Sequence, residues 1–320
     1  MNISVLILSG LYDFSTDLVV QELEKKGISY LRLNKEMFSD YRLTLDIGQE
    51  TLKIEIGSST YTVNQDVQAI YYRQPVFLRN SPGDPLSVED QLYRSQWMGF
   101  LRSLLVFDKT KWVNHPKSTY EAETKAYQLK VAKDIGFNIP DTVIGNDSDK
   151  FNRFGNSAII KSLDTVLLRD QDECLFTYST ISDAESLLDE EVRSSPLTVQ
   201  EYIYPKIDLR VTVIEDKIYG VQILSNGKGI DEDWRIIDKS KIEYVDINLP
   251  QHIKSMCFQL MDKLDLAFAA IDFILRDNEY IFIEINPTGE WGWLVKDDRR
   301  IDVDMAKILI GEESNDRIAI

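Results

Sequence analysis

Two carboxylates stand inside neighbouring apolar stretches near the end of the chain. Asp272 lies within residues 270–274, and Glu284 lies within residues 280–285. Burying a charged carboxylate in a strand is costly unless a partner compensates for the charge. Asn286 follows Glu284 by two residues, so all three side chains can share one face of two paired strands. Oxygen ligands of this kind suit a hard cation such as Mg²⁺, and we predict a metal site; the alternative is a strand face that contacts water.

Cations that suit a nucleotide stand at two other predicted strands. Lys161 ends the apolar stretch 157–161, where its ammonium can meet a phosphate as a point charge or lie on the surface. Arg210 leads into a strand and can bind a terminal phosphate with two nitrogens. The extended segment 199–203 before it can offer bare backbone to a purine, and Asp208 can accept ribose hydroxyls. The alternative for Asp208 is a salt bridge with a neighbouring cation.

Two further arginines follow features that are typical of ligand sites. Arg73 comes directly after the predicted buried strand 69–72, at the carboxyl edge of a sheet, where α/β proteins bind ligands. A salt bridge at a domain interface is an equal alternative. Arg235 follows the glycine-containing loop 226–229, which lacks the spacing of a phosphate-binding loop. We expect this loop to be mobile and to face the substrate.

The charge balance excludes several classes of function. The chain has 36 Lys and Arg against 53 Asp and Glu, which gives a net charge of −17. This charge argues against binding to duplex nucleic acid or to anionic membranes. Phosphate ligands remain compatible, because metal ions and a few cations can hold them locally. Cys174 and Cys257 are far apart and read as reduced thiols, and neither His115 nor His252 has zinc-site spacing. With no apparent signal peptide or spanning segment, we expect a cytoplasmic protein.

The elements that position these residues indicate an α/β (α+β) protein. A strand at 3–8, a helix ending at Lys26 and a strand at 28–33 predict a parallel sheet. Helices are predicted at 88–106, 120–135, 183–193 and 249–264. The strands predicted in the second half are 157–161, 198–203, 209–214, 217–224, 269–275 and 280–285. The pattern divides the chain into residues 1–115, 116–197 and 198–320.

Taken in chain order, these motifs resemble those of proteins with the ATP-grasp fold. Within that fold they are most similar to the graspetide synthetases, which are microviridin-type peptide macrocyclases. The resemblance covers essentially the whole chain. The segments that carry it are Tyr72-Arg73-Gln74-Pro75, Asn114-His115-Pro116, residues 136–142, Ile160-Lys161-Ser162-Leu163, residues 176–180, Gln200-Glu201-Tyr202-Ile203, Asp208-Leu209-Arg210-Val211, Asp272 and residues 284–291. Residues 164–172 contain no glycine, whereas many ATP-grasp enzymes have a glycine-rich loop there. This departure fits the peptide-maturing branch better than the D-alanine ligase branch.

The resemblance implies a pre-ATP-grasp domain at 1–115, a central small subdomain at 116–197 and a C-terminal ATP-grasp domain with a Mg-ATP site at 198–320. It implies ATP and two Mg²⁺ as cofactors, with the metal ions on Asp272, Glu284 and Asn286. The implied nucleotide-binding residues are Lys125, Lys161, Gln200, Glu201, Tyr202, Ile203 and Asp208. The implied catalytic residues are Arg210 and Arg235 at the transferred phosphoryl group and Arg73 at the acceptor carboxylate or product phosphate.

The implied reaction activates Asp or Glu side chains of a ribosomal precursor peptide as acyl phosphates. Ser or Thr hydroxyls, or Lys amines, of the same peptide then form intramolecular esters or amides, and ADP and phosphate are released. A homodimer is the family expectation, as is recognition of a leader segment, here assigned to a groove between residues 209–224 and 183–193. The alternatives are a ligase that adds glutamate to a protein tail, a small-peptide ligase, and a nucleotide-binding regulator without catalysis.

Overall fold

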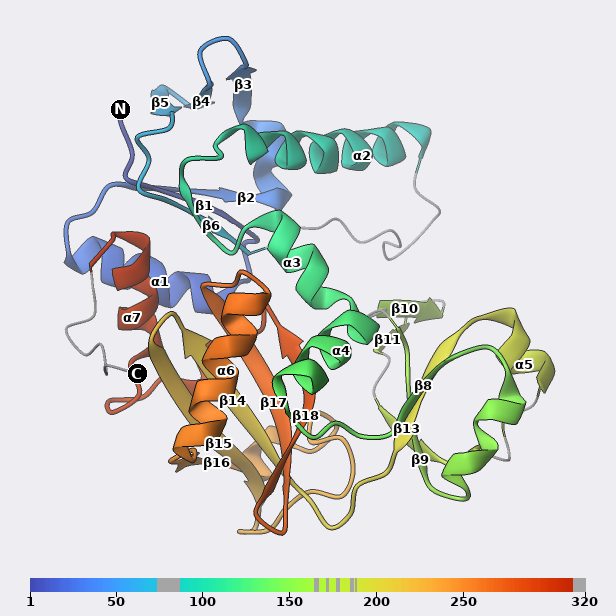
Figure 1. Ribbon diagram of the computed structural model, residues 1–320. Coiled ribbons are helices and arrows are strands. Elements are labelled where there is room, and N and C mark those ends of the chain that lie inside the picture. The colour runs from blue at the N-terminus through green and yellow to red at the C-terminus, as the bar shows by residue number, and fades with distance from the viewer. Residues whose placement is uncertain are drawn as a thin grey trace.

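The computed structural model describes residues 1–73, 87–163, 167–170, 173–176, 179–184, 187 and 189–312. Predictions that fall on residues 74, 75, 164–166, 171, 172, 177 and 178 lie outside the described residues. Figure 1 shows the molecule as three parts: a parallel sheet at the N-terminus, a small antiparallel sheet at the right, and a larger antiparallel sheet below.

The N-terminal sheet is parallel, as predicted. It consists of β1 (Val5–Ser9), β2 (Tyr30–Asn34), β6 (Ala69–Tyr72) and β7 (Lys111–Val113), in the order β2-β1-β6-β7. Helix α1 (Phe14–Lys25) connects β1 to β2. Leu6 and Leu8 pack into one core while Val5 and Ile7 pack into another, so both faces of β1 are buried. Burial on both faces explains why this strand is continuously apolar.

An antiparallel meander and a long helix complete the N-terminal part. The meander is β3 (Arg42–Asp46), β4 (Thr51–Ile56) and β5 (Ser59–Val63). Helix α2 (Val88–Ser103) ends before the predicted residue 106, because Leu104–Val106 tightens into a 3₁₀ turn. Leu92 is exposed, since the first turns of α2 extend beyond the sheet (Figure 1).

The predicted helix at 120–135 is two helices. Helix α3 (Pro116–Glu123) and helix α4 (Lys125–Ile135) are separated by Thr124, whose backbone is extended with ψ at 100°. Gly136 ends α4 in the left-handed region, with φ at 112°, so the predicted end of the helix at residue 135 is confirmed. The break turns α4 toward the large sheet, where it contacts β18.

The small sheet has the order β12-β9-β13-β8, and we call this part of the molecule the small lobe. Its strands are β8 (Thr142–Gly145), β9 (Ala158–Lys161), β12 (Thr180–Ser182) and β13 (Leu197–Glu201), and a separate hairpin joins β10 (Leu167–Asp170) to β11 (Glu173–Phe176). Helix α5 spans Asp189–Ser194, and residues 185, 186 and 188 of the predicted helix 183–193 lie outside the described residues. The predicted domain boundary at 197/198 falls within β13, which pairs with β8 and β9. The division into domains stays a prediction.

The large sheet is antiparallel and carries polar groups on one face. It runs β16 (Ile242–Ile247), β15 (Lys217–Ser225), β14 (Ile207–Ile214), β17 (Phe268–Arg276) and β18 (Glu279–Asn286). The other face is packed with α4 and α6 (Gln251–Lys263) through Leu209, Val211 and Val213. Helix α7 (Ile301–Leu309) lies beside α1 and ties the C-terminal part to the N-terminal sheet (Figure 1).

A β-bulge in β18 decides which of its side chains face the core. Glu284 pairs with Asp272, but Phe282 pairs with Phe273, so Ile283 is the extra residue. With strict alternation Phe282 and Glu284 would share a face. The bulge instead buries Phe282 in the core and leaves Glu284 on the polar face.

Candidate active site

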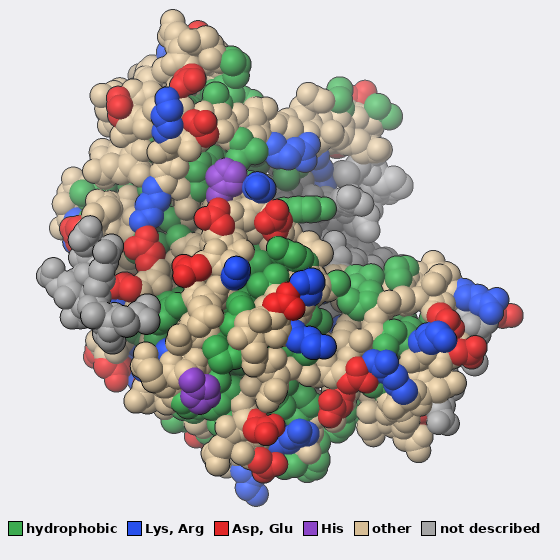
Figure 2. Space-filling model, viewed as in Figure 1, with side chains coloured by type: hydrophobic (Ala, Val, Ile, Leu, Met, Phe, Trp, Pro, Cys, Tyr) green, Lys and Arg blue, Asp and Glu red, His purple; other side chains and the backbone are tan. Residues whose placement is uncertain are grey.

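A cavity of about 540 Å³ lies between the small lobe and the polar face of the large sheet. Helix α4 contributes Lys125 and Leu129 to its wall. The small lobe is the projection at the right of Figure 2, and positive and negative side chains are interspersed over this face of the molecule. The cavity therefore sits where two separately formed sheets meet.

The predicted metal ligands lie together at one end of this cavity. Asp272 and Glu284 are paired in the register of β17 and β18. The Asn286 amide nitrogen lies 3.1 Å from Glu284 Oε1 and 3.4 Å from Asp272 Oδ2. The prediction that these three side chains share one face is confirmed, because all three line the cavity. The metal site stays a prediction.

Each carboxylate has a cationic partner, as its apolar setting requires. Arg210 Nη1 lies 2.7 Å from Asp272 Oδ1, and Lys125 Nζ lies 2.6 Å from Glu284 Oε2. Burial and the neighbouring Glu284 charge raise the pKa of Asp272 above its usual value, although Arg210 opposes this. Burial acts in the same direction on Glu284, but the charges of Lys125 and Lys161 outweigh it and hold the pKa of Glu284 below its usual value.

Lys161 and Arg235 line the same cavity. Lys161 ends β9, and burial lowers the pKa of its ammonium group below the usual value despite the opposing charge of Glu284. Arg235 is bonded by its Nε and Nη2 atoms to the Asp233 carboxylate at 2.9 and 2.7 Å. Both cations therefore lie where a polyphosphate could reach them, and the phosphate-binding role of Lys161 stays a prediction.

The predicted adenine-binding segment lines the cavity, but its backbone is only partly available. Gln200, Glu201, Tyr202 and Ile203 all line it. Residues up to 201 belong to β13, which is paired with β8 on one side and β9 on the other, and the Glu201 N–H donates to the Asp141 carbonyl at 2.9 Å. The expectation of bare backbone is wrong for this part, because both edges of β13 are used. Tyr202 and Ile203 lie beyond the strand.

Asp208 forms the salt bridge that was its alternative role. The Lys206 ammonium lies 2.5 Å from Asp208 Oδ2, and both residues line the cavity. Burial raises the pKa of Asp208 above its usual value, and the Lys206 charge reduces this effect. Lys206 is a cavity cation that the sequence reading missed, although its position two residues before Asp208 on an extended segment signals the pairing.

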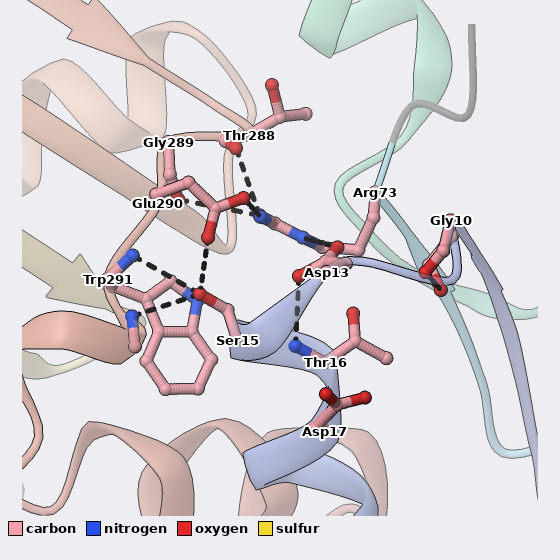
Figure 3. Close-up of polar contacts among 12 residues, drawn as sticks. Gly10, Asp13, Ser15, Thr16, Asp17, Arg73, Thr288, Gly289, Glu290 and Trp291 are labelled. Carbon is pink, nitrogen blue, oxygen red and sulfur yellow. Dashed lines mark hydrogen bonds and ion pairs between the residues drawn. The ribbon is translucent and has the colours of Figure 1, made fainter.

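Arg73 lies at the interface between the N-terminal part and the large sheet. Its Nε atom lies 2.9 Å from Asp13 Oδ2, and its Nη2 atom lies 2.8 Å from Glu290 Oε1 (Figure 3). Its side chain is 3% exposed, and it is not among the described residues that line the cavity. The structure therefore has the interface salt bridge, and the sequence reading missed the partners Asp13 and Glu290. A direct catalytic role of Arg73 stays a prediction.

A family model described as the RimK-like ATP-grasp domain matches residues 123–312. The chain belongs to this family. The matched segment contains the small lobe, the large sheet and every cavity-lining residue named above. The ATP-grasp enzymes are ADP-forming carboxylate ligases, and the resemblance predicted from the sequence motifs is confirmed.

Solved structures of ATP-grasp ligases match nearly the whole chain. One is a RiPP-associated ATP-grasp ligase from Chryseobacterium gregarium in complex with ADP and a leader and core peptide, with 26% identity, 98% of each chain covered and a TM-score of 0.82. Another is macrocyclase MdnC from Microcystis aeruginosa MRC bound with precursor peptide MdnA, with 26% identity, 97% of this chain and 100% of that chain covered, and a TM-score of 0.81. A comparison with curated proteins finds no match.

The donor set of this ATP-grasp site fits a hard metal ion. Two carboxylates and one amide provide the oxygen ligands that Mg²⁺ prefers. Nowhere among the described residues do three or more His, Cys, Asp or Glu side chains form a group that could hold a metal ion. In the described part of the chain, none of the helices combines the length and apolarity needed to cross a membrane.

Two other sequence predictions are corrected by the structure. The loop 226–229 does not line the cavity; Ser225 and Lys228 close it with two backbone hydrogen bonds, and a Cβ on Gly229 would lie 1.8 Å from the Lys206 carbonyl oxygen. Helix α5 lies on the outer side of the small lobe, apart from β14 and β15, so these elements do not form a common leader groove (Figure 1).

Proposed function

We propose that this ATP-grasp enzyme activates Asp or Glu side chains of a ribosomal precursor peptide and joins them to Ser, Thr or Lys side chains of the same peptide. One observation carries the proposal: a single cavity gathers Lys161, Arg210 and Arg235 beside the carboxylates Asp272 and Glu284. The similarity to peptide-bound ligases over 97–98% of the chain supports a peptide as the substrate.

The nucleotide lies between the two sheets. Tyr202 and Ile203 present backbone to the adenine, with Gln200 and Glu201 behind them. Asp208 faces the ribose, and its pairing with Lys206 keeps that carboxylate in position. Lys161 and Lys125 hold the inner phosphates, because a desolvated ammonium interacts strongly with an anion in a site that excludes water.

The reaction has two steps. A carboxylate oxygen of the peptide attacks the γ-phosphorus, the bond to the bridging oxygen of ADP breaks, and an acyl phosphate forms. A hydroxyl or amine of the peptide then attacks the acyl carbon, phosphate leaves with the electron pair of the broken C–O bond, and the nucleophile loses a proton. Arg210 stabilises the transferred phosphoryl group and then the acyl phosphate, with Arg235 as the second cation.

Asp272, Glu284 and Asn286 hold two Mg²⁺ ions in this proposal. Bound Mg²⁺ supplies charge neutralisation for the phosphates and orients them for transfer. Because Arg210 and Lys125 already lie against Asp272 and Glu284, the ligands and the phosphate-binding cations are held as one charge-balanced group.

The proposal further includes a homodimer in the cytoplasm. The chain has two cysteines that are far apart in the sequence, which fits a reducing compartment where disulfides are rare. Both ester and amide bonds are compatible with the cavity, because either nucleophile reacts with the same acyl phosphate.

The test is an incubation with candidate precursor peptides that contain Asp or Glu together with Ser, Thr or Lys side chains, including any that is encoded beside this gene. ATP and Mg²⁺ are added, and ADP formation is followed. The mass of the peptide is measured by mass spectrometry, both intact and after fragmentation. We expect ADP release and the loss of one water mass for each bond formed, with crosslinks between acidic and Ser, Thr or Lys side chains. A gain of amino-acid residues would instead show a tail or small-peptide ligase, and ATP binding without turnover would show a regulator.

A further inference from the structure

The turn that follows β18 is held by residues of the N-terminal part. We call residues 287–292 the cavity turn. Asn114, which is 2% exposed, donates its Nδ2 to the Pro287 carbonyl at 2.8 Å. Arg73 Nη1 donates to the Thr288 and Gly289 carbonyls at 3.0 and 3.4 Å. This turn comes late in the sequence, yet its backbone carbonyls are bound by side chains from the first 114 residues.

The carboxylate of the same turn is also held from the N-terminal part. Glu290 accepts hydrogen bonds from Arg73 Nη2 at 2.8 Å and from Ser15 Oγ at 2.7 Å, one on each oxygen. The Gly292 N–H donates to the same Ser15 hydroxyl at 2.9 Å. Figure 3 shows Arg73 reaching from the end of β6 to the turn, with Ser15 approaching from the start of α1.

All three guanidinium nitrogens of Arg73 donate to protein partners. Its Nε is bonded to Asp13, its Nη1 to two carbonyls and its Nη2 to Glu290. The ring of Tyr71 lies 5.8 Å from its guanidinium carbon. The Arg73 side chain is 3% exposed, and a substrate carboxylate could bind its guanidinium only by displacing one of these partners, so a role through the turn fits the contacts better than a direct one.

The cavity turn lies directly against the proposed phosphate-binding group. Gly289 and Glu290 line the cavity, and the Glu290 carbonyl accepts from Arg210 Nη2 at 3.4 Å. A Cβ on Gly289 would lie 2.7 Å from the Ala270 Cβ, so the turn is in contact with β17, the strand that carries Asp272. A displacement of the turn therefore moves the Glu290 carbonyl, which is the partner of Arg210.

We infer that Arg73 is a positioning residue: by holding the cavity turn it sets Arg210 at the transferred phosphoryl group. The inference rests on the proposed role of Arg210. A misplacement of about 1 Å in a reacting group lowers rates by up to about 100-fold. Loss of the Arg73 contacts should thus weaken interactions specific to phosphoryl transfer and leave the binding of the nucleotide itself unchanged.

The chain offers a matched control in Arg32. Its side chain is 15% exposed and donates to Ser9, Gly10, Asp17 and Asn34, all within the N-terminal part. Arg73→Lys and Arg32→Lys both replace a many-donor guanidinium by an ammonium that cannot reach all of its partners. Only Arg73→Lys releases the cavity turn.

The experiment compares two probes on each variant: MgADP alone, and MgADP with aluminium fluoride, which imitates the transferring phosphoryl group. Arg210→Lys is the reference. For Arg73→Lys we expect about 10- to 100-fold weaker binding of the fluoride complex and unchanged binding of MgADP. Arg32→Lys should bind both probes like the wild type. Ser15→Ala, which removes one hydroxyl, keeps the test available if Arg73→Lys does not fold, and we expect a smaller loss in the same direction.

The outcomes separate the inference from the proposed function. If Arg210→Lys loses the fluoride complex while Arg73→Lys and Ser15→Ala keep it, the positioning role is overturned and the role of Arg210 stands. If Arg210→Lys also keeps it, the proposed role of Arg210 fails and the inference falls with it. An equal loss in Arg32→Lys would show a general effect of the N-terminal part and would overturn the inference. Neither probe contains a peptide, so these results do not depend on the identity of the substrate.

Discussion

Arg210 and Asp272 are direct neighbours across β14 and β17, and one nitrogen of Arg210 binds both oxygens of Asp272, at 2.7 and 2.9 Å. Their side chains are only 10% and 22% exposed. Each charge therefore offsets the burial of the other, and the proposed phosphate-binding cation and metal ligand form one unit.

This pairing predicts that a second substitution can restore stability to an Arg210 variant without restoring its activity. Arg210→Met should lower the free energy of unfolding by about 3 kcal/mol, because Asp272 is left as an uncompensated buried charge. The double variant Arg210→Met with Asp272→Leu should recover most of that loss, while ADP formation stays absent. Urea unfolding and an ADP assay measure the two effects, and a double variant as unstable as the single one would show that the pair is not compensating.

Glu284 should be required for Mg²⁺-dependent turnover. Glu284→Gln keeps the size of the side chain but removes the charge, and we expect at least about a 100-fold loss of ADP formation, since metal ions contribute several kcal/mol to phosphoryl transfer. Glu215→Gln is the control, because Glu215 is ion-paired with Lys111 away from the cavity lining. Normal turnover in Glu284→Gln would remove this residue from the metal site; Asp272→Asn should behave like Glu284→Gln.

Lys161 should contribute to nucleotide affinity. Lys161→Met should weaken ATP binding about 10- to 100-fold, because hydrogen bonds to charged groups contribute about 1.5–3 kcal/mol. Lys130→Met is a matched control, since Lys130 lies on α4 and is ion-paired with Asp134 on the surface. Calorimetric titration with MgATP compares the two variants, and equal affinities would place Lys161 outside the phosphate site.

Gly289 should not tolerate a side chain. Gly289→Ala places a Cβ 2.7 Å from Ala270 and 3.2 Å from the Asn286 Cβ, so we expect a loss of about 1–3 kcal/mol in unfolding free energy and reduced turnover. Gly99→Ala in α2 meets nothing within 4 Å and should stabilise the protein by about 0.5–1 kcal/mol. Similar thermal unfolding of the two variants would contradict the close contact at Gly289.

The Asp13–Arg73 ion pair predicts a pH-dependent contribution to stability. Burial alone would raise the pKa of Asp13, but the Arg73 charge and hydrogen bonds with Arg73 and Thr16 outweigh it and hold the pKa below 3.8. A lowered pKa gives stability that is complete above the unfolded pKa and is lost as the pH falls through the folded pKa. Asn caps a helix as well as Asp does, so Asp13→Asn isolates the ion pair.

We expect Asp13→Asn to cost about 3 kcal/mol at neutral pH, since it breaks a pair in which Arg73 is 3% exposed. The difference from the wild type should stay constant down to about pH 4 and shrink below it. Unfolding free energies measured across this range provide the check; a difference that grew on acidification would have the wrong sign for an ion pair.

Much of the candidate site was predictable because its residues are close in sequence or lie at fixed offsets in strands. Asp272, Glu284 and Asn286 stand inside apolar stretches, where a charge has to be compensated, and strand periodicity correctly placed them together. The Gly136 helix stop and the parallel N-terminal sheet were predictable for the same local reasons.

Other features depend on contacts between distant segments. Strict alternation would place Phe282 and Glu284 on one face, and only the bulge at Ile283 separates them. The break at Thr124 divides a segment whose apolar spacing reads as one helix. Each is selected by packing against another element, which outweighs local preference.

The sequence by itself determined the chemistry: which carboxylates and cations lie in apolar strands, and hence the ATP-grasp character of the chain. The tertiary structure decided the partners. It placed Arg73 against Asp13 and Glu290, which are 60 and 217 residues away in the sequence. The position of Arg73 directly after β6 suggested a ligand-binding residue, but Arg73 does not line the cavity. Periodicity tells which face of an element a side chain occupies, but the partner across that face depends on how the whole chain packs.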